Sequence, residues 1–227
     1  MTAAADLRAR GFAFVRASET KGLLGPLPDW EAFAASWNDL RPDAYRPEGD
    51  RLRRHSVMVF ANGKPSVAPR RAHYQSREHN PLYGGAERWY EPVEPAHAEG
   101  PCVAAVLAAC ASLFDPLKPG RFWNVELHQF RILAREGAPG RPTPEGVHRD
   151  GVDFVLALLV RRENVASGTT TVHAPSGETL GDFTLTEPLD AAFVDDARVL
   201  HGVTPVTALA PGRPSFRDVL VATFSRP

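Results

Sequence analysis

The stretch that decides how this chain is interpreted is Pro144–Gly151, with the sequence PEGVHRDG. It places an imidazole, His148, two residues before a carboxylate, Asp150, and a second imidazole, His201, follows fifty-one residues after Asp150. Successive side chains of an extended segment point to opposite faces, so His148 and Asp150 project to the same side. Two nitrogens and one oxygen on one side of a metal ion form a facial triad that leaves coordination positions open. The sequence therefore predicts a metal centre on these three residues.

The spacing alone is weak evidence, because short motifs recur by chance. The chain has eight histidines, and a second match, His97-Ala98-Glu99, occurs earlier. His97 falls in the first turn of a predicted helix, and no partner ligand follows it at strand spacing. We therefore discard the His97/Glu99 pair as a metal site.

The composition indicates one domain. A chain of 227 residues with 43% hydrophobic residues suits a single domain over 1–227. A net charge of −1 argues against a nucleic-acid partner. No apolar run approaches the ~18–20 residues that cross a bilayer, and the arginines near the N-terminus argue against a signal peptide. Cys102 and Cys110 fall in a helical pattern as buried free thiols, so we expect a cytoplasmic protein without membrane contact.

The part of the chain before residue 120 is predicted to be rich in helix. Residues 61–95 hold prolines, glycines and aromatic residues without periodicity, which is typical of a lid or of a loop that lines a substrate site. The periodic segments predict helices over 3–10, 30–40 and 96–113 and strands over 11–15 and 56–60.

The part after residue 120 changes to the period of strands. Turn signals separate the runs, including Pro-Ser-Gly at 175–177. Helices followed by many strands predict an α+β, mainly β fold, a jelly roll with helices packed on one face. The metal-site residues then lie at strand ends, near the mouth of a small barrel. The predicted strands cover 122–134, 152–161, 169–173, 178–186, 191–195, 198–206 and 217–225.

A cation near the end of the chain suggests the cosubstrate. Fe(II) held by a facial triad needs electrons to activate O2, and 2-oxoglutarate is a common source. The distal carboxylate of 2-oxoglutarate needs a cation once it is buried. Arg217 opens the last strand and shares a face with Val219, Val221 and Thr223, whereas Arg213 lies in a Pro/Gly turn. We favour Arg217 as the anchor, with Arg213 as the alternative.

Five segments of the chain together resemble the motifs of a known family: 128–131, 142–154, 162–164, 201–205 and 217–220. The chain resembles Fe(II)/2-oxoglutarate-dependent dioxygenases of the bacterial amino-acid hydroxylase group that includes L-isoleucine dioxygenase. The resemblance implies a double-stranded β-helix with iron on His148, Asp150 and His201. It also implies a free L-amino acid substrate that is hydroxylated at an unactivated C–H, or oxidised at a thioether, with release of succinate and CO2.

The sequence also supplies further candidates around the site. Gln129 and Arg131 share one face of their predicted strand with apolar residues, so they are candidates to bind 2-oxoglutarate, although an outward structural role is the alternative. Arg53 and Arg54 could meet a substrate carboxylate, because arginine matches carboxylates bidentately. They could also form a solvated basic edge. Asp153 is a candidate for substrate binding that could instead cap a turn.

One segment departs from the family pattern. The family tends to show a Gly-Gly pair after the asparagine of the motif at 162–164, where this chain has Ser167-Gly168-Thr169-Thr170. The departure concerns the substrate pocket and not the iron. Two alternatives remain at this stage: a cupin-like metalloenzyme that does not use 2-oxoglutarate, and a non-enzymatic β-barrel that senses a small molecule.

Overall fold

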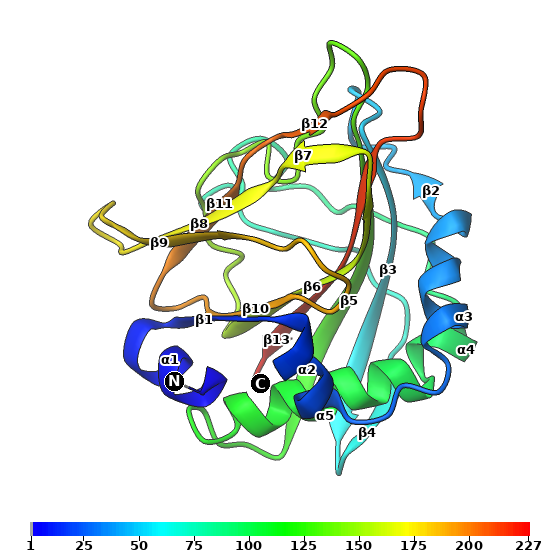
Figure 1. The fold of residues 1–227 in the computed structure, drawn as a ribbon. Helices are drawn as coiled ribbons and strands as arrows, with labels where there is room; N and C mark the ends of the chain where they lie inside the picture. Colours follow the sequence, from blue (N-terminus) through cyan, green and yellow to red (C-terminus); the bar gives the residue numbers. More distant parts are fainter. Residues whose placement is uncertain (1) are drawn as a thin grey trace.

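A computed structural model describes residues 2–227, in which antiparallel sheets carry helices on one outer face (Figure 1). The helices are α1 (Ala3–Arg10), α2 (Ala17–Leu24), α3 (Trp30–Ala35), the 3-10 helix η1 (Ser36–Asp39), α4 (Pro95–Ala98) and α5 (Pro101–Phe114). The strands are β1 (Phe12–Val15), β2 (Arg41–Pro42), β3 (Arg51–Ala61), β4 (Lys64–Val67), β5 (Phe122–Leu133), β6 (Phe154–Glu163), β7 (Val165–Ser167), β8 (Thr169–His173), β9 (Thr179–Thr184), β10 (Ala191–Asp195), β11 (Leu200–Val203), β12 (Val206–Ala208) and β13 (Phe216–Ser225).

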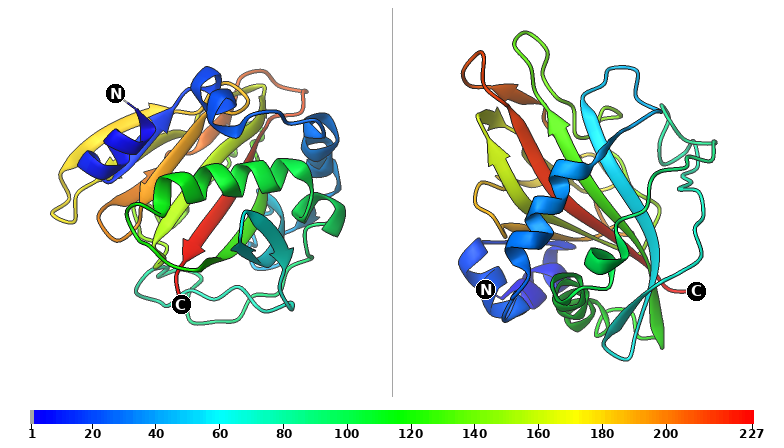
Figure 2. Two further views of the ribbon diagram at one scale, coloured as in Figure 1. Left: turned by 90° about the horizontal axis from the view of Figure 1, so that it is seen from below. Right: turned by 90° about the vertical axis from the view of Figure 1, so that its right-hand side faces the viewer.

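One large sheet and two small ones make up the barrel. The large sheet has the order β1-β10-β6-β13-β5-β3-β2, with β4 paired to β3. Its long strands β13, β5 and β3 lie side by side (Figure 2). The small sheets, β11-β8-β9 and β12-β7, lie on the other side of the barrel from α5. The predicted jelly roll with helices on one face is confirmed.

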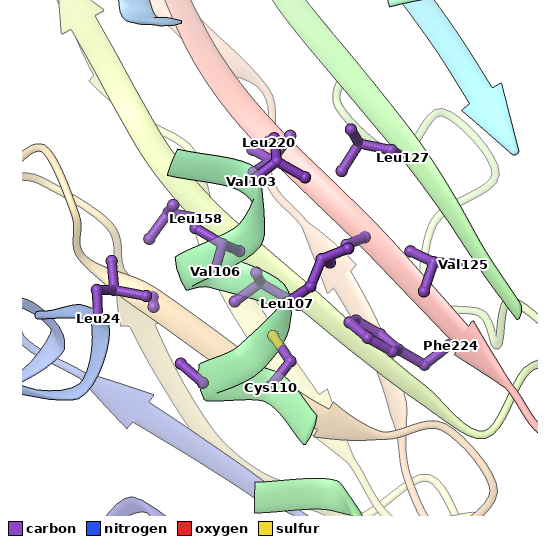
Figure 3. Packing of buried hydrophobic residues seen from close by; sticks show 14 of the residues in the cluster. Leu24, Val103, Val106, Leu107, Cys110, Val125, Leu127, Leu158, Leu220 and Phe224 are labelled. Carbon is purple, nitrogen blue, oxygen red and sulfur yellow. The ribbon is translucent and has the colours of Figure 1, made fainter. Parts of the chain in front are cut away.

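Helix α5 covers the outer face of the large sheet (Figure 2). It begins with Pro101 in its first turn, where proline sacrifices no helical hydrogen bond. Its apolar side chains, such as Val103 and Leu107, pack with Leu220 and Phe224 of β13 (Figure 3). Burial of each such side chain stabilises the fold by roughly 1.5–3 kcal/mol. This packing turns one face of the sheet into the main core.

Alternation along β5 then decides which side chains face the barrel interior. Trp123, Val125 and Leu127 belong to the core beneath the helices. The intervening residues Glu126 and His128 line an internal cavity. Because the period of a strand is two, Phe130 and Ile132 face the same cavity as Glu126 and His128.

Most of the predicted elements are present, with differences at their ends. The predicted strand 56–60 begins earlier, at Arg51, so the basic residues Arg51, Arg53 and Arg54 are part of β3. The predicted strand 198–206 is divided into β11 and β12 at Thr204 and Pro205. Helix α2 was not predicted. None of the helices in the described residues is long and apolar enough to cross a membrane.

The irregular region predicted over 61–95 is largely irregular in the structure as well. The residues after β4 form a loop, which we call the covering loop, residues 68–94. Two backbone hydrogen bonds between His73 and Arg88 close its central part into a wide hairpin, with N···O distances of 2.9 and 3.0 Å. Several of its side chains line the cavity, as the prediction of a lining loop requires.

Candidate metal centre and its cavity

The segment after Pro144 runs beside β11 and brings the three predicted ligands together. His148 and His201 exchange two backbone hydrogen bonds of 2.9 Å, and their rings lie 4.8 Å apart between centroids. Asp150 places one oxygen 3.8 Å from His148 Nε2 and the other 3.5 Å from His201 Nε2. All three donor atoms lie within 4.8 Å of one another. These separations exceed hydrogen-bond length, so they leave room for a cation between the three groups.

Neighbouring groups fix the orientation of the segment. Asp196 accepts hydrogen bonds from the backbone N–H groups of Asp150, Gly151 and Val152, at 3.0, 2.8 and 3.1 Å. His148 Nδ1 lies 3.0 Å from the carbonyl oxygen of Gly146, to which it can only donate. This hydrogen bond leaves Nε2 of His148 free to bind a metal, the arrangement that metal-binding histidines usually adopt.

The charges of the group suit a cation. Burial opposes protonation of His148, but the carboxylates of Asp150 and Glu145 outweigh it and raise the pKa of His148 to about 9. Burial also disfavours the ionised form of Asp150, but the two imidazoles outweigh it and lower the pKa of Asp150 to about 2. Asp150 therefore stays ionised while His148 carries a proton, and a metal ion can displace that proton. Two imidazoles and one carboxylate are the donor set that fits Fe(II) with open positions.

Arg217 reaches the same cavity from β13. Its side chain is buried, and its Nε has no hydrogen-bond partner among residues 2–227. Burial, together with the charge of Arg162, lowers the pKa of Arg217 to about 10. Arg213, the alternative anchor, is exposed in the turn before β13 and does not line the cavity. A buried guanidinium with a free N–H requires an anion, and Arg217 is placed to receive one.

A second group of arginines lines the cavity beside β3. Within the described part of the chain, Arg51, Arg53 and Arg88 each have a buried Nε without a hydrogen-bond partner. The carboxylate of Asp43 lies 3.8 Å from Arg51 and 3.7 Å from Arg53. Burial lowers the pKa of Arg53 to about 10. The three guanidinium groups, which we call the arginine wall, thus outnumber the carboxylate that faces them and form a second place for an anion.

Another cluster of histidines lies next to the arginine wall. His55, His73, Glu126 and His128 place their donor atoms within 4.8 Å of one another. Glu126 lies 3.0 Å from His55 Nε2 and 2.6 Å from His73 Nδ1, which are hydrogen-bond distances. Arg53 Nη2 lies 2.8 Å from His128 Nδ1, and because arginine only donates, the proton of neutral His128 is on Nε2. Burial lowers the pKa of His128 well below its usual value, so the ring is neutral. The cluster is therefore a hydrogen-bond network in which Glu126 is the partner of His55 and His73, and Arg53 is the partner of His128.

The structure corrects the prediction that Gln129 and Arg131 bind 2-oxoglutarate. Both lie on the face of β5 that is covered by helices. Gln129 donates to Ser36 Oγ at 2.8 Å, and Arg131 makes two hydrogen bonds of 2.7 Å to the buried carboxylate of Asp218. The apolar neighbours of these residues mark the core beneath the helices and not the cavity. Their roles are structural.

Arg54 and Asp153 also lie away from the cavity, so their predicted contacts with substrate are corrected. Arg54 points to the opposite face of β3 from Arg53 and forms ion pairs with Asp39 and Glu94, at 2.7 and 2.9 Å. Asp153 pairs with Lys118 and accepts a 2.8 Å hydrogen bond from the backbone N–H of Arg226. Arg53 alone of the predicted substrate contacts lines the cavity.

Several cavity residues were missed by the sequence analysis. Glu126 and His128 alternate with core residues on β5, a signal that was present but was assigned to the wrong face. Gln75 and Arg88 lie in the covering loop, where no periodicity indicates the direction of a side chain. Asp196 follows β10 and gave no local signal for its contact with the Asp150 segment.

Comparison with known proteins identifies the class. Residues 34–223 match the 2OG-Fe dioxygenase family, and the chain belongs to this family. Its members use Fe(II), 2-oxoglutarate and O2, so the chain is an oxidoreductase. The predicted family, enzyme class and cofactors are confirmed, and the two alternatives without 2-oxoglutarate are set aside.

Individual relatives cover nearly the whole chain. The chain is 24% identical over 238 residues to 3(1)-hydroxy-L-isoleucine 4-dioxygenase of Pantoea ananatis (strain AJ13355), an alignment that covers 100% of the chain and 96% of that relative. A solved structure of a bsmA homologue from Methylobium petroleophilum PM1 has a TM-score of 0.89 at 38% identity, over 98% of the chain and 91% of that structure. IDO from Bacillus thuringiensis has a TM-score of 0.80 at 18% identity, over 98% and 93%.

Proposed function

We propose that this dioxygenase acts on a free L-amino acid. It hydroxylates an unactivated C–H, or oxidises a thioether, and holds its iron on His148, Asp150 and His201. The substrate, 2-oxoglutarate and O2 give the oxidised amino acid, succinate and CO2, so that one oxygen atom enters the substrate and one enters succinate. We also propose that it works in the cytoplasm, in keeping with its buried free thiols Cys102 and Cys110.

The observation that carries the proposal is the presence of two separate cationic places in one cavity. Arg217 on β13 and Arg51 on β3 both lie opposite Ile132 of β5, one on each side. Two strand spacings therefore separate them, roughly 10 Å between backbones. One anion, the distal carboxylate of 2-oxoglutarate, fits Arg217. A second anion, the carboxylate of an amino acid, fits the arginine wall, and the Pantoea relative is named for an amino acid, 3(1)-hydroxy-L-isoleucine.

The residues of the cavity then have distinct tasks. Bound iron and 2-oxoglutarate would supply the oxidising chemistry when they are present. Arg217 would orient 2-oxoglutarate by its distal carboxylate, and Arg53 and Arg88 would orient the substrate. Fixing both molecules in an enclosed cavity lowers the entropic part of the barrier and keeps water away from the reacting atoms.

A substrate screen tests the proposal. The protein is loaded with Fe(II), and each of the twenty amino acids is assayed for succinate release together with a product heavier by one oxygen. We expect at least one amino acid with an aliphatic or thioether side chain to stimulate succinate release. If 2-oxoglutarate produces its visible absorption band with the anaerobic Fe(II) protein, yet no amino acid gains an oxygen, the substrate class is wrong.

A further inference from the structure

One side chain of the covering loop contacts a predicted iron ligand directly. The amide nitrogen of Gln75 donates to Asp150 Oδ1 at 3.1 Å. The amide oxygen of Gln75 accepts from Arg88 Nη2 at 3.0 Å and from Asn80 Nδ2 at 3.1 Å. Arginine has only donors, so the oxygen of the amide must face Arg88 and its nitrogen must face Asp150. The network therefore fixes the direction in which Gln75 donates.

We propose that Gln75 is a positioning residue that holds Asp150 in a one-oxygen binding mode. The hydrogen bond from Gln75 engages Oδ1, while Oδ2 lies 3.5 Å from His201 Nε2. The backbone N–H of Asp150 is held by Asp196 at 3.0 Å, which limits rotation of the segment. A carboxylate that bound through both oxygens would fill one of the positions that the triad must leave open. Gln75 disfavours this mode, because its hydrogen bond takes one lone pair of Oδ1 and holds that oxygen toward the amide.

The covering loop is built to deliver Gln75 to this place. His73, two residues earlier, is joined to Arg88 by two backbone hydrogen bonds, and its ring lies 2.6 Å from Glu126 of β5. Asn80 is buried and accepts from the backbone N–H of Tyr83 at 2.8 Å, which fixes the other partner of the amide. A segment without regular secondary structure thus supplies an oriented donor to the metal centre. The histidine cluster around Glu126 therefore has a structural role, because the contact between His73 and Glu126 anchors the loop that carries Gln75.

The same amide links the metal centre to the arginine wall. Arg88 is one of the three guanidinium groups proposed to receive the substrate, and it shares Gln75 with Asp150. The role of Gln75 rests on the proposed metal site but not on the identity of the substrate. It can therefore be tested with neither substrate nor 2-oxoglutarate present.

The experiment is a Co²⁺ titration of the metal-free protein, in which binding is measured by calorimetry and the visible absorption spectrum is recorded. Gln75→Leu keeps the approximate size of the side chain but removes donor and acceptor. We expect Co²⁺ affinity to fall about 10- to 100-fold, the range found when a residue that orients a metal ligand is lost. We also expect a weaker visible band, because Asp150 then binds through both oxygens and raises the coordination number. Arg88→Met should have a smaller effect, since Asn80 still holds the amide.

Controls separate this role from a purely structural one. Leu82→Ala alters an exposed side chain of the same loop and should leave Co²⁺ affinity and spectrum unchanged. If Gln75→Leu does not fold, Gln75→Met carries the same test. Wild-type affinity and spectrum in the Gln75 variant would overturn the proposal, even if its melting temperature falls. Absence of Co²⁺ binding by the wild-type protein would instead contradict the metal centre and with it the proposed function.

Discussion

Two groups of histidines and carboxylates lie in this cavity, and only one of them has the geometry of a metal centre. In the group of His148, Asp150 and His201, the nitrogen–oxygen separations are 3.5 and 3.8 Å. In the cluster around Glu126 the corresponding separations to His55 and His73 are 3.0 and 2.6 Å. Donor atoms bound at ~2 Å to one ion lie roughly 3 Å or more apart, whereas shorter contacts are hydrogen bonds. The first group has room for an ion, whereas the 2.6 Å contact between His73 and Glu126 in the second is too short for two ligands of one ion and is a hydrogen bond.

The charges that adjoin the two groups also distinguish them. Arg53 donates to His128, and Arg71 lies 3.9 Å from Glu126, so permanent cations already adjoin the cluster. The metal-centre group is approached instead by Gln75 and by the carboxylate of Asp196, which offer a neutral donor and an acceptor. Residue type and a separation within 4.8 Å are common to both groups and are therefore insufficient to identify a metal site. The individual nitrogen–oxygen distances and the neighbouring charges distinguish the two groups.

The largest effect is expected from the ligands themselves. His201→Ala should reduce succinate release to background and remove the visible band that 2-oxoglutarate produces with anaerobic Fe(II) protein, because it leaves two donors in place of three. Activity is measured by succinate formation, with a melting curve to show that the variant is folded. Retention of the band would show that the iron lies elsewhere.

The next effect concerns the cosubstrate. Arg217→Met should raise the KM for 2-oxoglutarate by roughly 30- to 700-fold, since loss of a buried charged partner costs about 2–4 kcal/mol. Arg213→Met changes an exposed residue of the same charge and should leave this KM unaltered. Equal effects in the two variants would contradict the assignment of Arg217.

A comparable test sharpens the role of the arginine wall. Arg53→Met should raise the KM for the amino acid by about 10- to 100-fold, or roughly 1.4–2.8 kcal/mol, and leave the KM for 2-oxoglutarate within a factor of about 2. The two constants are measured separately with the other reactant saturating. A rise in the KM for 2-oxoglutarate alone would contradict the proposal, because it would mean that the arginine wall binds 2-oxoglutarate and not the amino acid.

The smallest effect on catalysis is expected on the far face of β5. Arg131→Met leaves the buried carboxylate of Asp218 with only Arg161, at 3.7 Å. We expect the free energy of unfolding to fall by about 2–3 kcal/mol, less than for a fully unpaired buried charge. Urea denaturation measures this loss, and the KM for 2-oxoglutarate should stay unchanged. A raised KM for 2-oxoglutarate with an unaltered free energy of unfolding would contradict the structural role and indicate that Arg131 acts in the cavity.

The fold was predictable because its signals are local. Alternating apolar residues, proline and glycine turns and the helical period of α5 identify most elements without knowledge of their partners. The convergence of His148, Asp150 and His201 and the position of Arg217 in the cavity could also be predicted, because a strand has only two faces and the motif supplies the spacing.

The rest of the site depends on contacts between distant segments. For β5 the sequence shows two faces but not which of them the helices cover, so Gln129 and Arg131 were placed in the cavity in error. Gln75, Arg88 and Asp196 lie in or beside irregular segments, and their direction is set by backbone hydrogen bonds to residues far along the chain. No periodicity can reveal such contacts.

The most direct test of the account is the number of ions bound per chain. Metal-free wild-type protein, Asp150→Ala and Glu126→Gln are each titrated with Co²⁺, and bound metal is measured after dialysis. We predict one ion per chain in the wild-type protein and in Glu126→Gln, and none in Asp150→Ala. Two ions in the wild-type protein, or loss of the ion in Glu126→Gln, would contradict the distinction between the two groups.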